Sequence, residues 1–530
     1  MSRARGVGRQ PLSWDTAPIH PILVAAYPSL YLFAQNAADQ VTIDPLWSPL
    51  LISVGGMAVA LAILWGLLRD PVRAGLLATL GGALFFTYGH AWTAAAELLS
   101  SQLWLLACWV LLAGIGLGLI VVARRWAEAV TRGLNAVAAV AVVMNLVLIG
   151  GHLMSGVAVG SVTTPLRDAA IGSAAPATRP DIYYIVPDRY ASKEALAETY
   201  GYDNSAFYTA LEERGFYVAR EAHANYIKTP LSLVAVLDME YVDTAELNAE
   251  ASSGADRGPI HRRLGDHLAV PVLLKSLGYQ YVHVANWWEP TRSNVDADRI
   301  YRYEGESEFS SVFWRTTLMR AFVEEGPALD PWDWTVLRKH SETELAALNG
   351  PIPTLSSPKF VFAHLLLPHD PYVFNVDGSF MDRPQVAAQG DVESYIRQLE
   401  FLNSQLLGII DRATAEADVA PIFIIQADEG PFPARYQRDE WGFTWHQATG
   451  AELEQKFGIL NAIRLPGVDA EAAGLHPAMT QVNTFRIVFN EYFGGRLPLL
   501  PERTYSHPDL YRFYDTFDIT ERLAAGLRDP

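Results

Sequence analysis

The 530-residue sequence predicts an N-terminal bundle of five transmembrane helices followed by an extracytoplasmic α/β domain. Five long runs without charged residues fill the first third of the chain, and short apolar runs alternate with helical patterns in the rest. Three of the short runs end on carboxylate or imidazole side chains. The carboxyl ends of parallel strands meet at one edge of a sheet, so these side chains are expected at a common site.

The five uncharged runs have the length of membrane spans. They are residues 16–38, 48–68, 74–96, 100–123 and 133–156. A helix needs about twenty apolar residues to cross ~30 Å of hydrocarbon, and each run meets this length. Buried helices of a soluble protein fit less well, because such runs rarely also have basic flanks on alternate sides. A cleaved signal peptide is also disfavoured, since Pro21, Pro28 and Gln35 interrupt the first run.

The arginine residues orient the spans. Arginines precede the first run and lie between the second and third and between the fourth and fifth, while the other two connections have no Lys or Arg. Basic residues near spans stay on the cytoplasmic side, so everything after the fifth run is expected outside the cytoplasm. We therefore expect a multi-pass protein of the cytoplasmic (inner) membrane. Its parts would be a transmembrane domain at 1–156, a linker of small residues at 157–180 and the extracytoplasmic domain at 181–530.

The charge distribution agrees with this division and narrows the possible partners. Residues 1–170 contain nine Lys and Arg and seven Asp and Glu, and since the whole chain has a net charge of −18, residues 171–530 carry −20. Such an acidic domain argues against nucleic acid as a partner. An anionic substrate would need a specific cationic group, such as a bound metal. The only cysteine, Cys108, lies in the fourth run, so we expect no disulfide and no thiol nucleophile outside the membrane.

The second part of the chain has the alternation of an α/β sheet flanked by helices. Strands are expected at residues 181–188, 215–222, 279–286, 359–367, 421–427 and 457–465, and helices at 192–200, 204–214 and 391–415. The Trp-containing region 301–350 fits neither pattern.

Thr229 is the candidate nucleophile. Thr229 followed by Pro230 predicts a helix with the threonine as N-cap and the proline as first helical residue. The hydroxyl would then lie at the positive end of the helix, where an alkoxide or a phosphate ester is stabilised. This segment taken alone also fits a threonine that only caps the helix.

Four motifs resemble a known group of proteins. The segments PDIYYIVPDRYAS, NYIKTPLSLVAVLD, KFVFAHLLLPHDPYVF and IIQADEGP are similar to those of the membrane-anchored branch of the alkaline phosphatase and sulfatase superfamily. That branch includes lipoteichoic acid synthases and lipid phosphoethanolamine transferases. The resemblance implies that Asp188 and Asp428 bind a divalent metal, that Thr229 is a nucleophile that also binds it, and that His364 and His369 line the substrate phosphate. Sulfate ester hydrolysis is not expected, because the modified cysteine of true sulfatases has no counterpart here.

The sequence departs from this group at two places. Glu429 replaces the histidine that follows the aspartate, and Leu367 and Pro368 replace Gly-Ser before the second histidine. If Glu429 is a ligand, the metal set is Asp188, Thr229, Asp428 and Glu429. Oxygen ligands suit Mn²⁺, Mg²⁺ or Ca²⁺ better than Zn²⁺, which remains an option.

Both histidines have alternative interpretations. His369 could orient the phosphate or protonate the leaving group, or it could simply be held in a turn by Asp370. His364 lies inside an apolar strand and could be a core histidine.

Two functions follow from the resemblance. The first is a metal-dependent transferase or hydrolase that acts through a phosphothreonine on a phosphorylated headgroup, of the glycerol phosphate or phosphoethanolamine type. Its substrate would be a membrane lipid or a lipid-linked glycan of the cell envelope. The second is a catalytically inactive protein of the same fold that senses lipid or acts as a scaffold.

Overall fold

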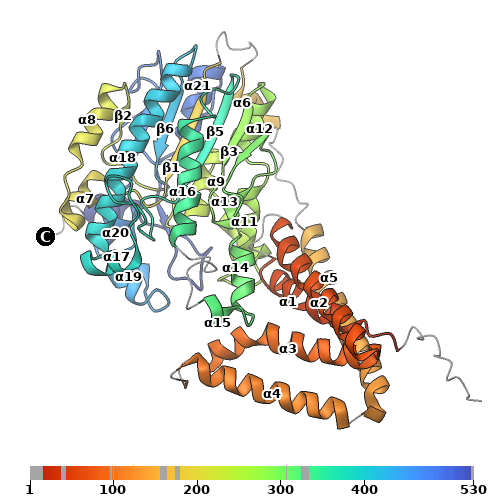
Figure 1. Cartoon of the computed structure of the whole chain (residues 1–530). Helices are drawn as coiled ribbons and strands as arrows, with labels where there is room; N and C mark the ends of the chain where they lie inside the picture. The colour runs from red at the N-terminus through yellow and green to blue at the C-terminus, as the bar shows by residue number, and fades with distance from the viewer. Residues whose placement is uncertain are drawn as a thin grey trace, which may run out of the picture. The chain divides into compact units, whose positions relative to one another are not determined.

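The computed structural model describes residues 16–37, 43–95, 98–99, 101–122, 124–155, 164–172, 179–305, 307–323 and 334–526. The chain divides into two compact units, whose elements are labelled in Figure 1. The helical unit contains residues 1–37, 42–157 and 306–333, and the α/β unit contains residues 38–41, 158–305 and 334–530.

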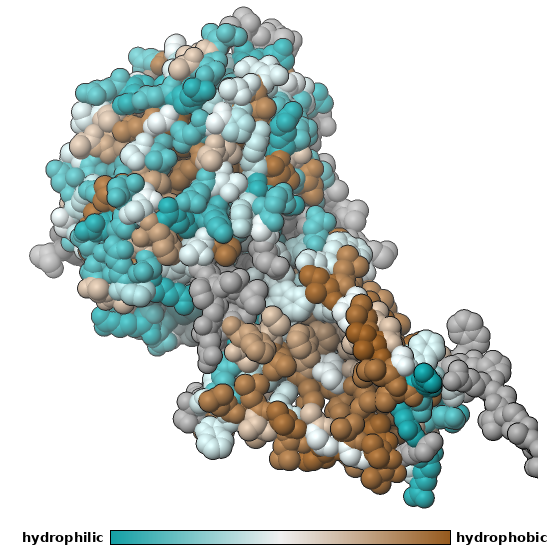
Figure 2. Space-filling view, in the orientation of Figure 1, coloured by the Kyte–Doolittle hydropathy of each residue, from teal (hydrophilic) through white to brown (hydrophobic). Residues whose placement is uncertain are grey.

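The helical unit contains four helices that could span a membrane. Its elements are α1 (His20–Gln35), α2 (Asp44–Leu68), α3 (Pro71–Ala95), α4 (Gln102–Val122), the 3-10 turn η2 (Arg124–Trp126), α5 (Ala127–Ser155), α14 (Glu308–Arg315) and α15 (Arg320–Val323). Helices α2 to α5 are long and apolar enough to cross a bilayer. Large apolar side chains on them face outward, such as Leu67 at 76% and Val122 at 83% exposure. Figure 2 shows hydrophobic residues gathered over these helices, a surface that requires a hydrocarbon environment.

The first expected span differs from the other four. Helix α1 has 16 residues, which is shorter than the ~20 needed to cross the hydrocarbon core. It packs among α2, α3 and α5. Polar contacts fix it there: His20 Nδ1 lies 2.6 Å from Thr79 Oγ1, and Asn135 donates to the carbonyl of Ala17 at 2.9 Å. Of the five predicted spans, four therefore have spanning length in the part of the chain that the structure describes.

Part of the region 301–350 belongs to the helical unit, which explains why it fits no α/β pattern. Phe309 of α14 packs edge-on against Phe33 of α1 at 5.6 Å, and Phe313 packs against Phe86 of α3 at 6.2 Å between ring centroids. The backbone N–H of Gly89 donates to the carbonyl of Thr316 at 3.0 Å. A Cβ at Gly89 would lie 2.1 Å from the carbonyl oxygen of Arg315, so this close approach requires glycine.

The α/β unit is built on a mixed, mostly parallel sheet of seven strands. The strands are β1 (Ile182–Pro187), β2 (Tyr217–Val218), β3 (Gln280–Val284), β4 (Arg299–Tyr301), β5 (Lys359–Leu365), β6 (Ile422–Gln426) and β7 (Asn461–Arg464), in the order β2-β7-β6-β1-β5-β3-β4. Within this sheet, β7 runs in the direction opposite to that of the other six strands. Strand β1 lies between β5 and β6, with Val186 opposite His364 and Ile185 opposite Ile425. A separate two-stranded ribbon pairs β8 (Tyr505–Ser506) with β9 (Phe517–Asp518).

Helices cover both faces of this sheet. They are α6 (Thr164–Ala170), α7 (Lys193–Tyr200), α8 (Ser205–Glu213), α9 (Thr229–Asp238), α10 (Thr244–Glu250), α11 (Gly258–Gly265), α12 (Ala269–Ser276), α13 (Glu289–Arg292), α16 (Trp334–Asn349), α17 (Arg383–Gln389), α18 (Asp391–Glu416), α19 (Ala434–Arg438), η4 (Trp445–Gln447), α20 (Gly450–Phe457), α21 (Thr484–Phe493) and α22 (Thr520–Gly526). Helices α8, α16 and α18 form one layer, and α6, α9, α12 and α21 form the other (Figure 1). Helix α6 lies within the stretch 157–180 that was expected to be an irregular linker.

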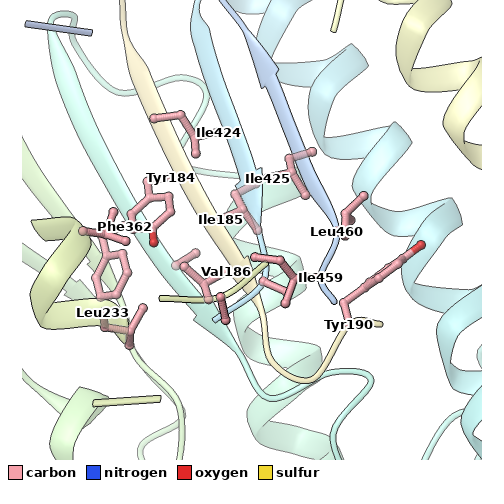
Figure 3. Close-up of a cluster of buried hydrophobic side chains, with 14 of the residues drawn as sticks. Tyr184, Ile185, Val186, Tyr190, Leu233, Phe362, Ile424, Ile425, Ile459 and Leu460 are labelled. Carbon is pink, nitrogen blue, oxygen red and sulfur yellow. The ribbon is translucent and has the colours of Figure 1, made fainter. Parts of the chain in front are cut away.

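Strand β1, which leads to the site, is held by buried side chains on both sides of the sheet. The side chains of β1 are fully buried, and Tyr184 stacks on Phe362 of β5 with 5.5 Å between ring centroids. Figure 3 shows these two rings beside Leu233 of α9 on one face of the sheet. Helix α9 and the end of β1 are thus positioned by the same apolar layer.

Candidate metal centre and active site

Three side chains from adjacent strands meet at one edge of the sheet. Asp188 follows β1, His364 lies near the end of β5, and Asp428 follows β6. Each offers a ligand atom, and these three atoms lie within 4.8 Å of one another. All three residues are buried, at 3%, 0% and 0% exposure. The convergence of strand ends predicted from the sequence is therefore present, with His364 as an added member.

The unpaired atoms of this group fit a bound cation. Asp188 Oδ1, His364 Nε2 and Asp428 Oδ2 are buried without a hydrogen-bond partner. Each such atom costs about 1–3 kcal/mol of desolvation, so three in contact would be unfavourable without a ligand. A divalent cation satisfies all three at once. One imidazole nitrogen and two carboxylates suit Zn²⁺ or Mn²⁺, so the site is more favourable for zinc than the all-oxygen set expected from the sequence.

Hydrogen bonds hold the ring of His364 in the orientation that a ligand needs. Its Nδ1 lies 3.0 Å from Thr291 Oγ1, and the Thr291 hydroxyl donates to Asn286 Oδ1 at 3.1 Å. The amide of Asn286 holds the same histidine, since its Nδ2 lies 3.1 Å from Nδ1 and donates to the carbonyl of His364 at 2.7 Å. These contacts direct Nε2 toward the carboxylates, 3.3 Å from Asp188 Oδ2.

The two carboxylates have opposite pKa shifts. Burial and the neighbouring charges of Asp188 and Glu429 raise the pKa of Asp428 well above its usual range. Burial also opposes ionisation of Asp188, but the histidines at 369 and 364 lower its pKa overall. Without a cation the pair therefore tends to hold one proton, and a cation would displace it.

Thr229 lies beside this group. Its side chain is close enough to Asp428 to lower the pKa of that carboxyl, against the larger effect of burial, which raises it. Thr229 is the first residue of α9 and Lys228 occupies the N-cap position, so the predicted capping role is corrected by one residue. The N–H groups of Leu231 and Ser232 both bond the carbonyl of Lys228 at 3.1 Å, and Pro230 has no N–H. An anion here would be stabilised mainly by the helix dipole and by side-chain cations.

Glu429 is not brought into the group of three. Its Oε1 lies 2.7 Å from Lys456 Nζ and 3.7 Å from Arg189 Nε. Burial lowers the pKa of Lys456 to about 8 despite the opposing charge of Glu429. The group of three that could hold a metal thus contains His364, which was expected to bind substrate, and does not contain Glu429. The role of Glu429 as a ligand stays a prediction.

His369 lies in the loop after β5, close enough to Asp188 for their charges to interact. Its Nδ1 contacts the backbone carbonyl of Asp370, and its own carbonyl accepts from Gln398 at 3.0 Å. Burial and the charge of Arg189 lower the pKa of His369. The ring is therefore neutral near neutral pH, which favours a phosphate-orienting role over that of an acid.

Five residues of this site were not found by sequence reasoning: Arg189, Lys228, Lys456, Asn286 and Thr291. Arg189 and Lys228 directly follow and precede Asp188 and Thr229, so adjacency to the predicted site was a usable signal. The other three are distant in sequence, and no motif marks them.

Comparisons with known proteins give matches among solved structures. Neither a protein-family model nor a curated protein matches the sequence. The C-terminal periplasmic domain of EptC from Escherichia coli matches with a TM-score of 0.42 at 12% identity, over 66% of this chain and 95% of that chain. The chain is similar in fold to phosphoethanolamine transferases and sulfatases. The motifs in the sequence resemble the same kinds of protein.

Two further matches extend this result. Lipooligosaccharide phosphoethanolamine transferase A from Neisseria meningitidis, an integral membrane protein, matches over 88% of this chain and 94% of its own, with a TM-score of 0.37 at 12% identity. A 2-O GAG sulfatase matches over 63% of this chain and 78% of its own, with a TM-score of 0.40 at 11% identity. At these identities the similarity is one of fold alone.

Proposed function

We propose that this chain is a membrane-anchored, metal-dependent transferase or hydrolase that acts on a phosphorylated headgroup through a phosphothreonine at Thr229. The supporting observation is the buried group of Asp188, His364 and Asp428, whose unpaired atoms suit a divalent cation. Thr229, at the start of α9, interacts with Asp428 of this group. A nucleophile, a candidate cation site and an orienting histidine thus lie together at the carboxyl edge of the sheet.

Asp188, His364 and Asp428 would hold the metal. When bound, a divalent cation supplies positive charge that favours the alkoxide form of a nearby hydroxyl and polarises a phosphoryl oxygen. The chain's own residues do the rest. Asp428 interacts with the Thr229 side chain and would provide a carboxylate acceptor for the hydroxyl proton.

In the first step Thr229 Oγ forms a bond to phosphorus, and the bond from phosphorus to the lipid alcohol breaks, so that the alcohol leaves and takes up a proton. In the second step water or another alcohol attacks phosphorus and releases Thr229 Oγ. His369 and Arg189 are placed to bind phosphoryl oxygens, since both interact with the charge of Asp188.

The same proposal places the α/β unit outside the cytoplasm. Arg69 and Arg73 lie between α2 and α3, and Arg125 and Arg132 lie between α4 and the apolar part of α5. Basic residues stay on the cytoplasmic side, so these arginines alone set the direction in which α2 to α5 cross the membrane. The orientation of the α/β unit is therefore the same whether or not α1 crosses the bilayer. Its substrate would be a lipid or lipid-linked glycan at the outer face.

The covalent intermediate is the first test. The purified full-length chain is incubated with a lipid extract carrying phosphorylated headgroups, quenched in acid and digested. Mass spectrometry should find one phosphate, with or without its headgroup, on the peptide that contains Thr229. Modification of a different residue, or none after demonstrated turnover, would contradict the proposed mechanism.

The orientation is tested separately. A reporter fused after Ser155, at the end of α5, should be active only outside the cytoplasm, and one inserted at Asp70 should be active only inside. The reverse pattern at either position would refute the proposed location of the site.

A further inference from the structure

Three cations surround one aromatic ring beside Thr229. Lys456 Nζ lies 3.4 Å from the ring centroid of Phe432, Lys228 Nζ lies 4.1 Å from it, and the guanidinium carbon of Arg189 lies 4.8 Å from it. Tyr436 stacks on the same ring with 4.4 Å between centroids, and its hydroxyl is 3.2 Å from Lys228 Nζ. This aromatic platform holds several positive charges close together.

The three cations are not equally neutralised. Lys456 pairs with Glu429 at 2.7 Å, and Arg189 pairs with Asp370 at 2.6 Å. No carboxylate of the described residues lies within ion-pair distance of Lys228 Nζ. Lys228 and Thr229 are both partly exposed, so a ligand can reach them from solvent. The amine nearest in sequence to the nucleophile thus has no ion-pair partner among the described residues. Burial lowers the pKa of Lys228 well below its usual range, and a bound anion would favour its charged form.

A second aromatic ring, that of Phe513, lies beside another cation. The guanidinium carbon of Arg257 lies 5.4 Å from the ring centroid of Phe513, and His507 stacks on that ring at 5.5 Å. A parallel bridge between Tyr226 and Tyr505 brings the segments that carry Lys228 and His507 side by side. Burial, followed by the charges of Lys228 and Arg257, lowers the pKa of His507 to about 3. No described carboxylate forms an ion pair with Arg257 either.

His507 has unused hydrogen-bonding capacity. It is fully buried, and neither ring nitrogen has a hydrogen-bond partner of good geometry among the described residues, the backbone at Asp509 being its nearest polar neighbour. The Asp509 carboxylate is held by Arg512 at 2.6 Å. A neutral imidazole with a free donor between two uncompensated cations is suited to an anion.

We propose that Lys228, Arg257 and His507 bind a second anionic group of the substrate, next to the phosphoryl group that is transferred to Thr229. The inference rests on the proposed function for the position of the phosphoryl group. The inference narrows the substrate class by the charge of the headgroup's distal group. The site would favour an anionic distal group and accept a neutral one. It would repel an ammonium, as in phosphoethanolamine, because the surrounding cations have no ion-pair partners.

Three soluble phosphate monoesters of similar size test this order. 3-Phosphoglycerate, glycerol 3-phosphate and phosphoethanolamine differ mainly in the distal group, which is a carboxylate, a hydroxyl or an ammonium. Isothermal titration calorimetry on the full-length, metal-loaded protein should show the tightest binding for 3-phosphoglycerate and the weakest for phosphoethanolamine. The dissociation constant should rise by about threefold or more from each ester to the next in this order. Equal affinities, or tighter binding of phosphoethanolamine, would overturn the proposal.

Variants assign the effect to the cluster. Lys228→Met and Arg257→Met keep most of the side-chain volume and should each weaken 3-phosphoglycerate by about tenfold, while phosphoethanolamine binds equally well or better. Lys339→Met removes an exposed lysine of α16 and should behave as wild type. An unchanged order of the three esters in both cluster variants would contradict the assignment. Repeating the titrations in phosphatidylcholine nanodiscs with and without phosphatidylglycerol shows whether an anionic lipid headgroup or only a soluble ester competes for the cluster.

Failure of the second anion site can be distinguished from failure of the proposed function. Phosphorylation of Thr229 without preference among the three esters would leave the function standing and refute the second anion site. A charge preference that depends on Lys228, with no phosphate ever found on Thr229, would support the anion site and refute the covalent mechanism.

Discussion

Thr229→Ala is expected to reduce turnover by on the order of 10⁴-fold or more, because no other hydroxyl would replace the attacking oxygen. The metal should remain, since Asp188, His364 and Asp428 provide a ligand set without it. Thr229→Ser keeps the hydroxyl at the start of α9 and should retain measurable turnover. The assay is release of headgroup by purified protein, with metal content measured on the same samples. Turnover of Thr229→Ala at the wild-type rate would exclude the phosphothreonine.

The second large effect is expected on stability, at Glu429. Glu429→Ala removes the partner of Lys456, in a pair whose side chains are only 3% and 0% exposed. Leaving one member of a buried pair uncompensated costs about 3–5 kcal/mol, and deprotonation of Lys456 would limit the loss to about 3 kcal/mol. The midpoint of thermal unfolding should fall by several degrees, while bound metal stays at the wild-type level.

A double variant separates this interpretation from a ligand role. Glu429→Leu combined with Lys456→Met replaces the ion pair by apolar side chains and should recover most of the lost stability. Glu429→Gln keeps the shape and should lie between. If Glu429→Ala instead loses the metal with an unchanged unfolding midpoint, the ligand set expected from the sequence is the correct one.

The centre of the sheet could be predicted because β1, β5 and β6 are fully buried and are followed closely by polar residues. Asp188 and Asp428 follow apolar runs directly, and in the structure β1 and β6 are neighbours. Helix α18 was equally clear, since its apolar spacing continues over 26 residues. The strand assigned at 215–222 was less successful: only Tyr217 and Val218 pair, as an edge strand.

The pairing of side chains that are distant in sequence could not be predicted. Nothing at Glu429 indicates that Lys456, at the end of α20, neutralises it. His364 joins the metal group because β5 pairs with β1 in a register that sets His364 opposite Val186. Its ring is then held by Asn286 and Thr291, which follow β3 in the chain.

The helical unit shows a different limit of sequence reasoning. Charge-free length predicted a span at 16–38, but the helix itself is only 16 residues, from His20 to Gln35, and makes polar contacts with α3 and α5. Hydropathy does not distinguish a short helix held inside a bundle from one that crosses the bilayer. Hydropathy also does not show that α14 belongs to the helical unit. Its Phe309 and Phe313 pack there, although the flanking sequence belongs to the α/β unit.

The metal content of the purified full-length chain is the most direct measurement. Protein dialysed against metal-free buffer and analysed by inductively coupled plasma mass spectrometry should retain one divalent ion per chain. Asp188→Asn, His364→Ala and Asp428→Asn should each lose it, whereas Glu429→Gln should keep it. A wild-type protein with no bound metal, or one whose metal survives all three substitutions but not Glu429→Gln, would contradict the site formed by Asp188, His364 and Asp428.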